Sequence, residues 1–215
     1  MPVAKSPLEL ARESPGSTKG RILAAAEAMF AEHGFAGAST REIAGRAGVN
    51  ISSLHYHWAS KETLYVAVFQ DVFTRLTDVL GGALARVTDE RHREVVVTRV
   101  MHELVAFMAE HRTVPKLLAR RLLEPDAEPG VDREVLGPAW DVFTAWMGKN
   151  RGRLSETELD MVMLSLHSVL LIYMLDSPSY RSLLGGSVFS APLREQLERH
   201  LVRLVEALLE PTCAH

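Results

Sequence analysis

The stretch Ser39–Lys61, STREIAGRAGVNISSLHYHWASK, decides the fold of this chain. Ser39 is followed three residues later by Glu42, which is the spacing of a capping box, so a helix is expected to begin there. Gly48 is expected to end that helix, because glycine adopts the left-handed conformation of many helix ends at little cost. A second helix is expected over about residues 50–58. The stretch therefore predicts two short helices joined by a tight turn.

The spacing of small and apolar residues indicates that these two helices cross closely. Ala44, Gly48 and Leu54 stand where such a crossing needs a small contact, a flexible turn and an apolar anchor. Leu54 and Trp58 are four residues apart and point back toward the first helix, and Val49 is expected to be buried in the turn. The outward face then carries mainly hydrogen-bonding side chains. This pattern predicts a helix-turn-helix whose second helix enters a DNA major groove.

The longer stretch TREIAGRAGVNISSLHYHWASKETL resembles the signature of the TetR family of transcriptional regulators. The resemblance extends back through TKGRILAAAEAMFAEHGF, so it covers roughly residues 18–65, and the remaining chain matches only in length and helical character. It implies an all-α homodimer that binds a palindromic operator in double-stranded DNA. It further implies that a small ligand releases the operator. We expect this effector to be mostly apolar, and we expect repression rather than activation.

The resemblance also implies a set of DNA contacts. Lys61 is expected to hold only a phosphate, whereas Arg41 can reach either a guanine edge or a phosphate. Ile51 is apolar where the family often has a polar or basic residue, and His55 stands where it usually has tyrosine, so base specificity cannot be copied from a relative. The expected DNA-binding residues are Ser39, Thr40, Arg41, Asn50, Ile51, Ser52, Ser53, His55, Tyr56, His57 and Lys61.

Composition divides the 215 residues into three expected segments. Residues 1–16 contain three prolines, balanced charges and no apolar run of the kind that a signal peptide requires, so they are expected to form a disordered arm. Residues 17–64 are expected to form the helix-turn-helix domain, and residues 65–215 a C-terminal helical domain for effector binding and dimerisation. The single cysteine, Cys213, excludes an intramolecular disulfide and favours a reducing compartment, so the cytoplasm is the expected location.

Net charge supports DNA binding only weakly. The chain carries −3 overall, but residues 17–64 hold five basic against four acidic groups. Such a small positive excess predicts modest nonspecific affinity for DNA. Helix N-termini and hydroxyl groups are therefore expected to share the phosphate contacts.

Helical periodicity runs through the whole chain, so the predicted fold class is all-α. The first helix of the DNA-binding domain is expected to begin near Ser17 and to end at Gly34. A long fourth helix is expected from Ser60 to about Val87, where it would link the two domains and transmit a tilt between them. Beyond it, the sequence shows no period-2 alternation and no repeat, which indicates helices to the end of the chain.

Two C-terminal helices are strongly apolar. Ser155 and Glu158 form a second capping box, and the helix that follows is apolar almost all round. A membrane span is the alternative, but it needs about 20 apolar residues, and this run is shorter and broken by polar groups, which favours a buried helix. The last helix, from Ser190, has two apolar faces, which suggests one partner in its own domain and one in a second chain.

The C-terminal domain is expected to hold both the effector and the dimer partner, although each candidate side chain is also compatible with a plain core position. Candidate effector-binding residues are Phe107, Met108, Trp140, Phe143, Met147 and His167. Candidate dimer-interface residues are Leu166, Leu170, Leu197, Leu201, Leu204 and Leu208.

Enzymatic signals are weak. His55 and His57 would point about 200° apart on a helix, so they cannot hold one metal together. The sequence contains no P-loop, glycine-rich nucleotide loop or His-Glu-x-x-His motif, so no cofactor and no catalytic residues are expected. Two alternatives to a ligand-responsive regulator remain, a helical enzyme and a constitutive interaction module without ligand gating.

Overall fold

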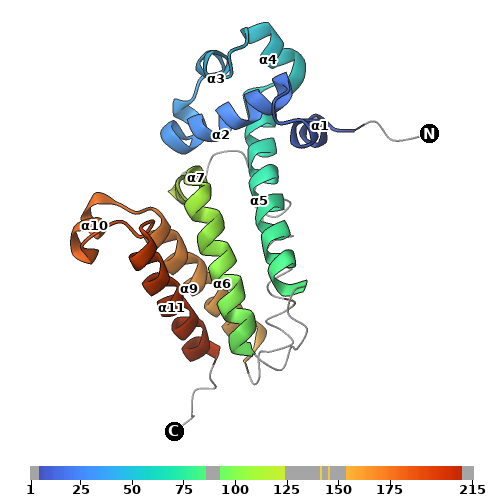
Figure 1. The fold of residues 1–215 in the computed structure, drawn as a ribbon. Coiled ribbons are helices and arrows are strands. Elements are labelled where there is room, and N and C mark those ends of the chain that lie inside the picture. The colour runs from blue at the N-terminus through green and yellow to red at the C-terminus, as the bar shows by residue number, and fades with distance from the viewer. Residues whose placement is uncertain (1–4, 86–92, 124–140, 142–144, 146–153, 210–215) are drawn as a thin grey trace. The chain divides into compact units, whose positions relative to one another are not determined.

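The computed structural model describes residues 5–85, 93–123, 141, 145 and 154–209. Within these residues every regular element is a helix, which confirms the predicted all-α class (Figure 1). The helices are α1 (Pro7–Glu13), α2 (Thr18–Gly37), α3 (Thr40–Arg46), α4 (Ile51–Trp58), α5 (Lys61–Ala85), α6 (Arg93–Glu110), α7 (Thr113–Leu123), α9 (Glu156–Met174), α10 (Pro178–Leu184) and α11 (Ala191–Leu209).

The chain divides into two compact units. The first holds the described residues up to Arg75 together with α7 from Lys116, and the second holds Leu76–Pro115 and the helices from α9 onward. The division falls inside α5 and inside α7, so both helices begin in one unit and end in the other. The sequence predicted this linking role for α5 but not for α7.

Aromatic side chains from α2 and α5 build the core of the first unit. Phe30 and Tyr65 meet edge to face with ring centroids 5.0 Å apart, and Tyr65 lies 4.9 Å from Phe69. Phe30 and Phe69 are fully buried, and Ile43 of α3 and Leu54 of α4 are buried as completely. Each fully buried side chain of this size stabilises the fold by about 2 kcal/mol. The helix-turn-helix is thus a small domain braced by α2 and the first part of α5.

The predicted helix signals in this unit are confirmed. Ser39 and Glu42 form a capping box at the start of α3. Gly48 has a φ of 67° after the end of α3, and Gly34 has a φ of 73° where α2 is interrupted. Val49 differs from the prediction, because it is only half-buried in the turn.

The prediction of a disordered arm over residues 1–16 is wrong for its central part. Residues Pro7–Glu13 form α1, which has a capping box from Ser6 and Glu9 and packs against α2. Proline at the first turn favours a helix there, because its missing N–H has no intrahelical partner at that position. Ala11 is buried, and Arg12 lies 3.4 Å from Asp71 of α5. The prediction of an arm rested on the prolines and the balanced charges, and the sequence alone does not reveal the contacts of Ala11 and Arg12 with the rest of the unit.

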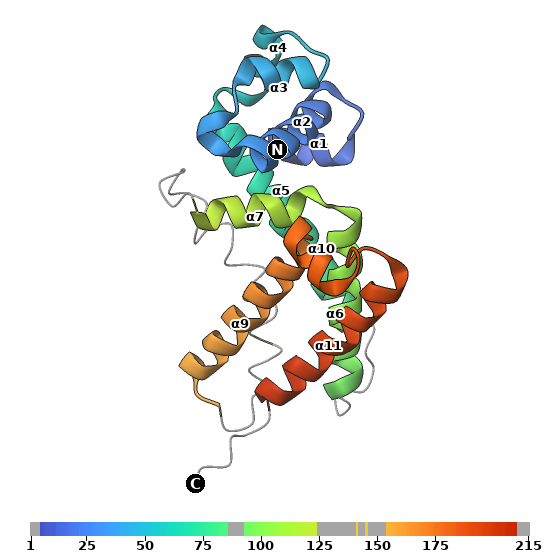
Figure 2. The same cartoon turned by 90° about the vertical axis from the view of Figure 1, so that its left-hand side faces the viewer.

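In the second unit, α6, α9 and α11 pack side by side (Figure 2). Four of the six leucines predicted for the dimer interface lie in this core instead, with at most 7% of their surface exposed, and they are Leu166, Leu170, Leu197 and Leu201. Leu204 and Leu208 are half-buried. The predicted interface residues lie on the more apolar face of each helix, and in the folded chain that face is buried against other helices of the same chain.

Helix α9 keeps an apolar outer face. It is long and apolar enough to cross a membrane by length and composition, with a mean hydropathy of 1.3 in its most apolar window. The inner side is the core just described. The outer side exposes Met161, Leu164 and Ile172 at 62, 60 and 45% of their surface. A helix with one buried and one exposed apolar face is also typical of a core helix whose outer face binds a partner.

Asp176 organises the connection between α9 and α11. Its carboxylate accepts hydrogen bonds from Arg181, from the Ser187 hydroxyl at 2.8 Å and from the Val188 amide at 3.1 Å. Burial alone would raise the pKa of this carboxyl, but these hydrogen bonds outweigh it and hold the pKa below its ordinary value. Asp176 therefore remains charged in the fold, tied to α10 and to the loop before α11.

Candidate nucleic-acid interface

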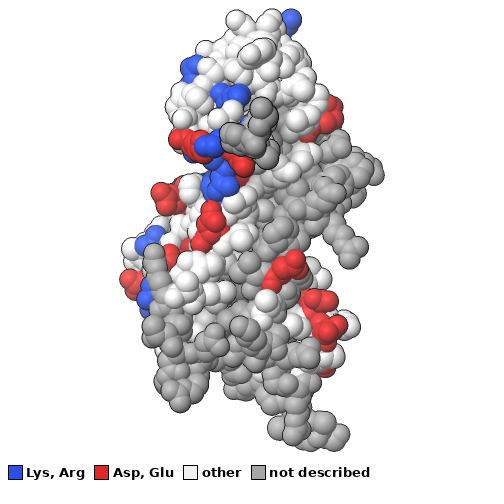
Figure 3. All heavy atoms as spheres, turned by 90° about the vertical axis from the view of Figure 1, so that its right-hand side faces the viewer, with Lys and Arg blue, Asp and Glu red and all other residues white. Residues whose placement is uncertain are grey.

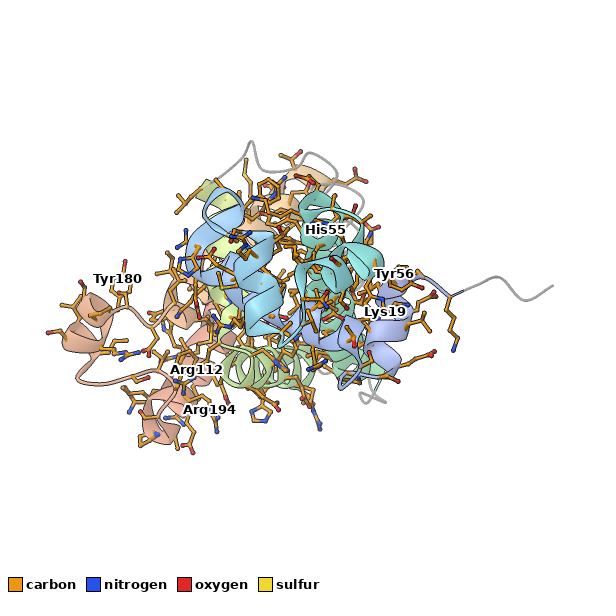
Figure 4. The ribbon with its side chains drawn as sticks, turned by 90° about the horizontal axis from the view of Figure 1, so that it is seen from above. Lys19, His55, Tyr56, Arg112, Tyr180 and Arg194 are labelled. Atoms are coloured by element: carbon orange, nitrogen blue, oxygen red, sulfur yellow. The ribbon has the colours of Figure 1, made fainter. Side chains whose placement is uncertain are left out.

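Helix α4 is fixed to its unit by two buried anchors, Leu54 at 0% and Trp58 at 2% exposure. Beside this buried strip the helix is open: Ile51 is 37% and Tyr56 85% exposed, and Ser52 and His55 are exposed as well. The view from above shows His55 and Tyr56 on α4 (Figure 4). The structure thus brings the α4 residues expected to read DNA onto one exposed helix face, apart from the half-buried Ser53 and His57.

Two of the expected DNA-binding side chains also serve as helix caps. The Ser39 hydroxyl donates to the Glu42 carboxylate at 2.5 Å and accepts from the Glu42 amide at 3.2 Å. The hydroxyl bond to the carboxylate, together with a bond from the Ser39 amide to the same carboxylate at 3.3 Å, lowers the pKa of Glu42. The Asn50 side-chain oxygen accepts from the Ser53 amide at 2.7 Å, which leaves its NH₂ group to donate. Both residues fix the N-termini of α3 and α4, whose positive dipole ends favour phosphate.

The histidines of α4 have unequal environments. His55 Nδ1 lies 3.3 Å from the Ala59 carbonyl oxygen, which can only accept, so Nδ1 donates in this bond. In the neutral ring, Nε2 is then left as a hydrogen-bond acceptor. His57 is half-buried, its ring stands against that of Tyr56 at 5.0 Å, and its Nδ1 is buried without a hydrogen-bond partner among the described residues. His55 is therefore better placed than His57 to reach DNA.

Lys61 does not stand free as the predicted phosphate ligand. Its ammonium donates to the carbonyl oxygens of Phe35 at 2.9 Å and Ala38 at 3.1 Å, and it lies 4.3 Å from the centroid of the Phe35 ring. The break at Gly34 explains this position, because it leaves carbonyl groups at the end of α2 without helical partners. Lys61 caps α2, and at most one of its three N–H groups remains for a phosphate.

Three other cations of the first unit are available instead. Arg41 is exposed at the start of α3, and Lys19 and Arg21 lie in the first turn of α2. None of the three side chains has an ion-pair or hydrogen-bond partner in the part of the chain that the structure describes. A terminal nitrogen of Arg21 is 3.5 Å from the position of a side chain placed at Gly48, so the guanidinium lies against the turn before α4.

Sequence reasoning counted Lys19 and Arg21 in the charge of the domain but assigned them no contact. Their position in the first turn of the helix that braces α3 and α4 could have indicated from the sequence that they lie near DNA. On the face drawn in Figure 3, Lys and Arg side chains at the top stand singly among uncharged surface rather than in a continuous basic patch. This agrees with the small positive excess of the segment.

The structure leaves the predicted effector residues as candidates. Phe107 and Met108 are buried on α6, and the Phe107 ring lies 4.6 Å from that of His111. His167 is half-buried on α9, and burial lowers its pKa, which favours the neutral ring. Trp140, Phe143 and Met147 lie outside the described residues.

Two further observations concern small ligands. An open groove of about 800 Å³ lies among α6, α9 and α11, with Glu94, His102 and Glu198 on its walls and none of the predicted effector residues. Within the described ranges, no group of three or more histidine, cysteine, aspartate or glutamate side chains could hold a metal ion.

Comparisons with known proteins agree with the geometry of the first unit. A family model described as "Bacterial regulatory proteins, tetR family" matches residues 22–68. The HTH-type transcriptional dual regulator CecR of Shigella flexneri is 30% identical over 149 residues, which cover 60% of this chain and 65% of that protein. The HTH-type transcriptional activator FasR of Mycolicibacterium smegmatis is 40% identical over 75 residues, 35% of this chain and 34% of that protein. The chain thus spans about two thirds and one third of these two relatives.

Solved structures share the fold over nearly the whole chain. A putative TetR-family transcriptional regulator from Mesorhizobium loti has a TM-score of 0.63 and 21% identity, with coverage of 96% of this chain and 98% of that one. The fatty acid degradation regulator FadR from Bacillus halodurans has a TM-score of 0.61 and 15% identity, with coverage of 88 and 97%. At these identities the likeness concerns the fold alone.

Proposed function

The chain belongs to the TetR family of bacterial transcriptional regulators, and we propose that it binds operator DNA through α4 and regulates transcription. It acts as a homodimer on an inverted repeat, as a repressor that a small, mostly apolar effector releases, and therefore in the cytoplasm, where operator DNA is found. The observation that carries the proposal is the exposed face of α4, held by Leu54 and Trp58, together with the cations Lys19, Arg21 and Arg41, whose side chains bond to no described residue.

The side chains of this face suit different parts of the DNA. The free Nε2 of His55 can accept from the amino group of adenine or cytosine, and Ile51 can contact a thymine methyl group. Arg41 donates to a guanine edge or a phosphate, while Lys19 and Arg21 hold phosphates. Base contacts from α4 thus supply sequence preference, and the cations of α2 supply affinity and orientation.

The outer face of α9 supports dimerisation with a second copy of the chain. Met161, Leu164 and Ile172 form an exposed apolar stripe. Between them, the Ser165 and Ser168 hydroxyls donate to carbonyl oxygens of their own helix at 2.8 Å, so this face holds no unsatisfied side-chain donor. A dry surface of small and apolar groups is suited to close helix packing across a twofold axis.

The effector proposal rests on the family resemblance and on the apolar side chains inside the second unit. Phe107 and Met108 supply apolar contact, and a neutral His167 supplies one donor and one acceptor. This combination suits a mostly apolar ligand with a single polar group.

Selection of binding sites from random DNA with the purified chain tests this function. An inverted repeat with half-sites about one helical turn apart is the expected result, because two α4 helices related by a twofold axis read two half-sites. Enrichment of no sequence by a folded, dimeric protein would contradict operator binding. Selection of a single half-site would contradict binding as a dimer, but it would still support DNA reading by α4.

A further inference from the structure

The C-terminal end of α2 is held by cations from two other helices. The backbone of Gly34, with a φ of 73° and a ψ of 179°, interrupts α2 and leaves carbonyl groups near it without helical partners. Lys61 of α5 takes two of these carbonyls after the break. Before the break, Arg120 of α7 donates from Nε to the Ala31 carbonyl at 2.9 Å and from a terminal nitrogen to the Glu32 carbonyl.

The two Arg120 bonds join residues 89 and 88 positions apart in the sequence. Arg120 is half-buried, and the part of its helix that belongs to the first unit also carries the buried Leu117 and Leu118. A guanidinium at the negative end of a helix is favoured both by its charge and by its fixed set of donors. The contact is therefore a defined cap rather than a loose surface ion pair.

The start of α7 is fixed differently. Thr113–Pro115 belong to the second unit, and the turn before α7 is closed by a bond from the Val114 amide to the His111 carbonyl at 2.9 Å. Arg112, in that turn, lies 4.4 Å from the centroid of the Phe189 ring, in the loop before α11. One short helix is thus tied at its start to the loop that Asp176 organises and at its end to α2.

The connection continues from α2 into the helix-turn-helix. While the Glu32 carbonyl accepts from Arg120, the Glu32 carboxylate binds Arg46 of α3 through two hydrogen bonds of 2.8 and 3.2 Å. Its bond with Arg46 lowers the pKa of Glu32, so the carboxylate is charged at neutral pH. Residue 32 therefore contacts α7 through its backbone and α3 through its side chain.

We propose that Arg120 is a positioning residue for DNA reading, through which α7 controls the placement of α3 and α4. The inference rests on the proposed function and adds to the predicted role of α5 a second connection between the units. With Arg120 on the carbonyls of Ala31 and Glu32, α2 and Glu32 hold α3 in place for binding. A shift of α7 that withdraws Arg120 leaves these carbonyls open and loosens the Glu32–Arg46 contact.

Hydrogen exchange of the full chain tests the contact without DNA. Arg120→Met removes the donors, and amide exchange over residues 30–46 is expected to accelerate about tenfold, because the cap no longer opposes local opening. Lys116→Met is the matched control: it removes the same charge from an exposed position of α7 that lies close enough to lower the pKa of Glu32. Equal exchange in Arg120→Met and in the wild type would overturn the proposal.

DNA binding tests the positioning role, with the sequence selected by the wild-type chain as probe. At a temperature where circular dichroism shows the variants folded, Arg120→Met is expected to bind about tenfold more weakly, a typical size for allosteric coupling. Arg120→Lys, which keeps the charge, is expected to lie between, and Lys116→Met near the wild type. Arg120→Met with unchanged affinity and only a lower melting temperature would show a purely structural role.

A double-mutant cycle tests the route through Glu32. Arg46→Met should weaken binding in the wild-type background but add little once Arg120 is replaced, because both substitutions break one connection. Fully additive losses would contradict the route. If the wild-type chain selects no DNA sequence, the proposed function fails, while the exchange experiment still tests the Arg120 contact by itself.

Discussion

Replacement of Lys61 by methionine separates a helix cap from a phosphate ligand. The substitution keeps the apolar length of the side chain and removes the ammonium that bonds to Phe35 and Ala38. Hydrogen bonds to charged groups contribute about 1.5–3 kcal/mol each, and the half-buried position of Lys61 places both near the lower end. With the contact over the Phe35 ring included, Lys61→Met is expected to lower the free energy of unfolding by about 3 kcal/mol.

Urea unfolding followed by circular dichroism measures that loss, and the salt dependence of operator binding provides the contrast. Each phosphate that a cation neutralises contributes about 0.9 to the slope of log affinity against log salt. Lys61→Met is therefore expected to leave the slope nearly unchanged, whereas Lys19→Met is expected to reduce it by about 1. Lys19→Met serves as the matched control. Lys19 belongs to the same unit, and its ammonium has no bonded partner among the described residues.

The role of Lys61 as a helix cap is refuted if Lys61→Met unfolds at the same urea concentration as the wild type and lowers the salt slope by about 1. That result would restore Lys61 as a phosphate ligand and would mean that the bonds to α2 contribute nothing to stability.

Three further substitutions give distinct outcomes. Arg41→Ala is expected to cost about 1–3 kcal/mol of binding and to relax the preference at one base pair, as measured by competition with single-base variants of the operator. Leu164→Glu is expected to give a folded monomer by sedimentation, whereas Leu201→Glu, with 1% exposure, is expected to unfold the chain; a dimeric Leu164→Glu protein would move the interface elsewhere. Asp176→Asn is expected to lower stability at pH 7 by about 2 kcal/mol. The pKa of Asp176 in the folded chain lies below 3.8, so the extra stability of the wild type over Asp176→Asn is complete above the unfolded pKa. This difference in the free energy of unfolding disappears as the pH falls through the folded pKa. Urea unfolding at several pH values measures it.

Local signals predicted the helix-turn-helix well. The Ser39–Glu42 capping box, Gly48 and the Leu54–Trp58 pair act within a few residues of one another, so their geometry follows from spacing alone. The same holds for the exposed face of α4, because the helical period separates it from the buried pair.

Long-range contacts account for most of what the sequence did not predict. Lys61 has the same charge whether it faces a phosphate or the end of α2, and only the folded chain brings Phe35 and Ala38 to it. Arg120 meets α2 across 89 residues, which periodicity cannot reveal. Leu166 and Leu201 were assigned to a dimer because a helical pattern identifies an apolar face but not the chain that covers it.

The claim that α4 reads bases is tested most directly by parallel selections from random DNA with the wild type, the double variant Ser52→Ala/His55→Ala and Lys19→Met. The wild type is expected to select an inverted repeat, and the double variant is expected to lose preference at one symmetric pair of positions while it keeps the spacing of the half-sites. Lys19→Met is expected to select the wild-type sequence with lower affinity throughout. A double variant that selects the wild-type sequence at every position would contradict base reading by the exposed face of α4.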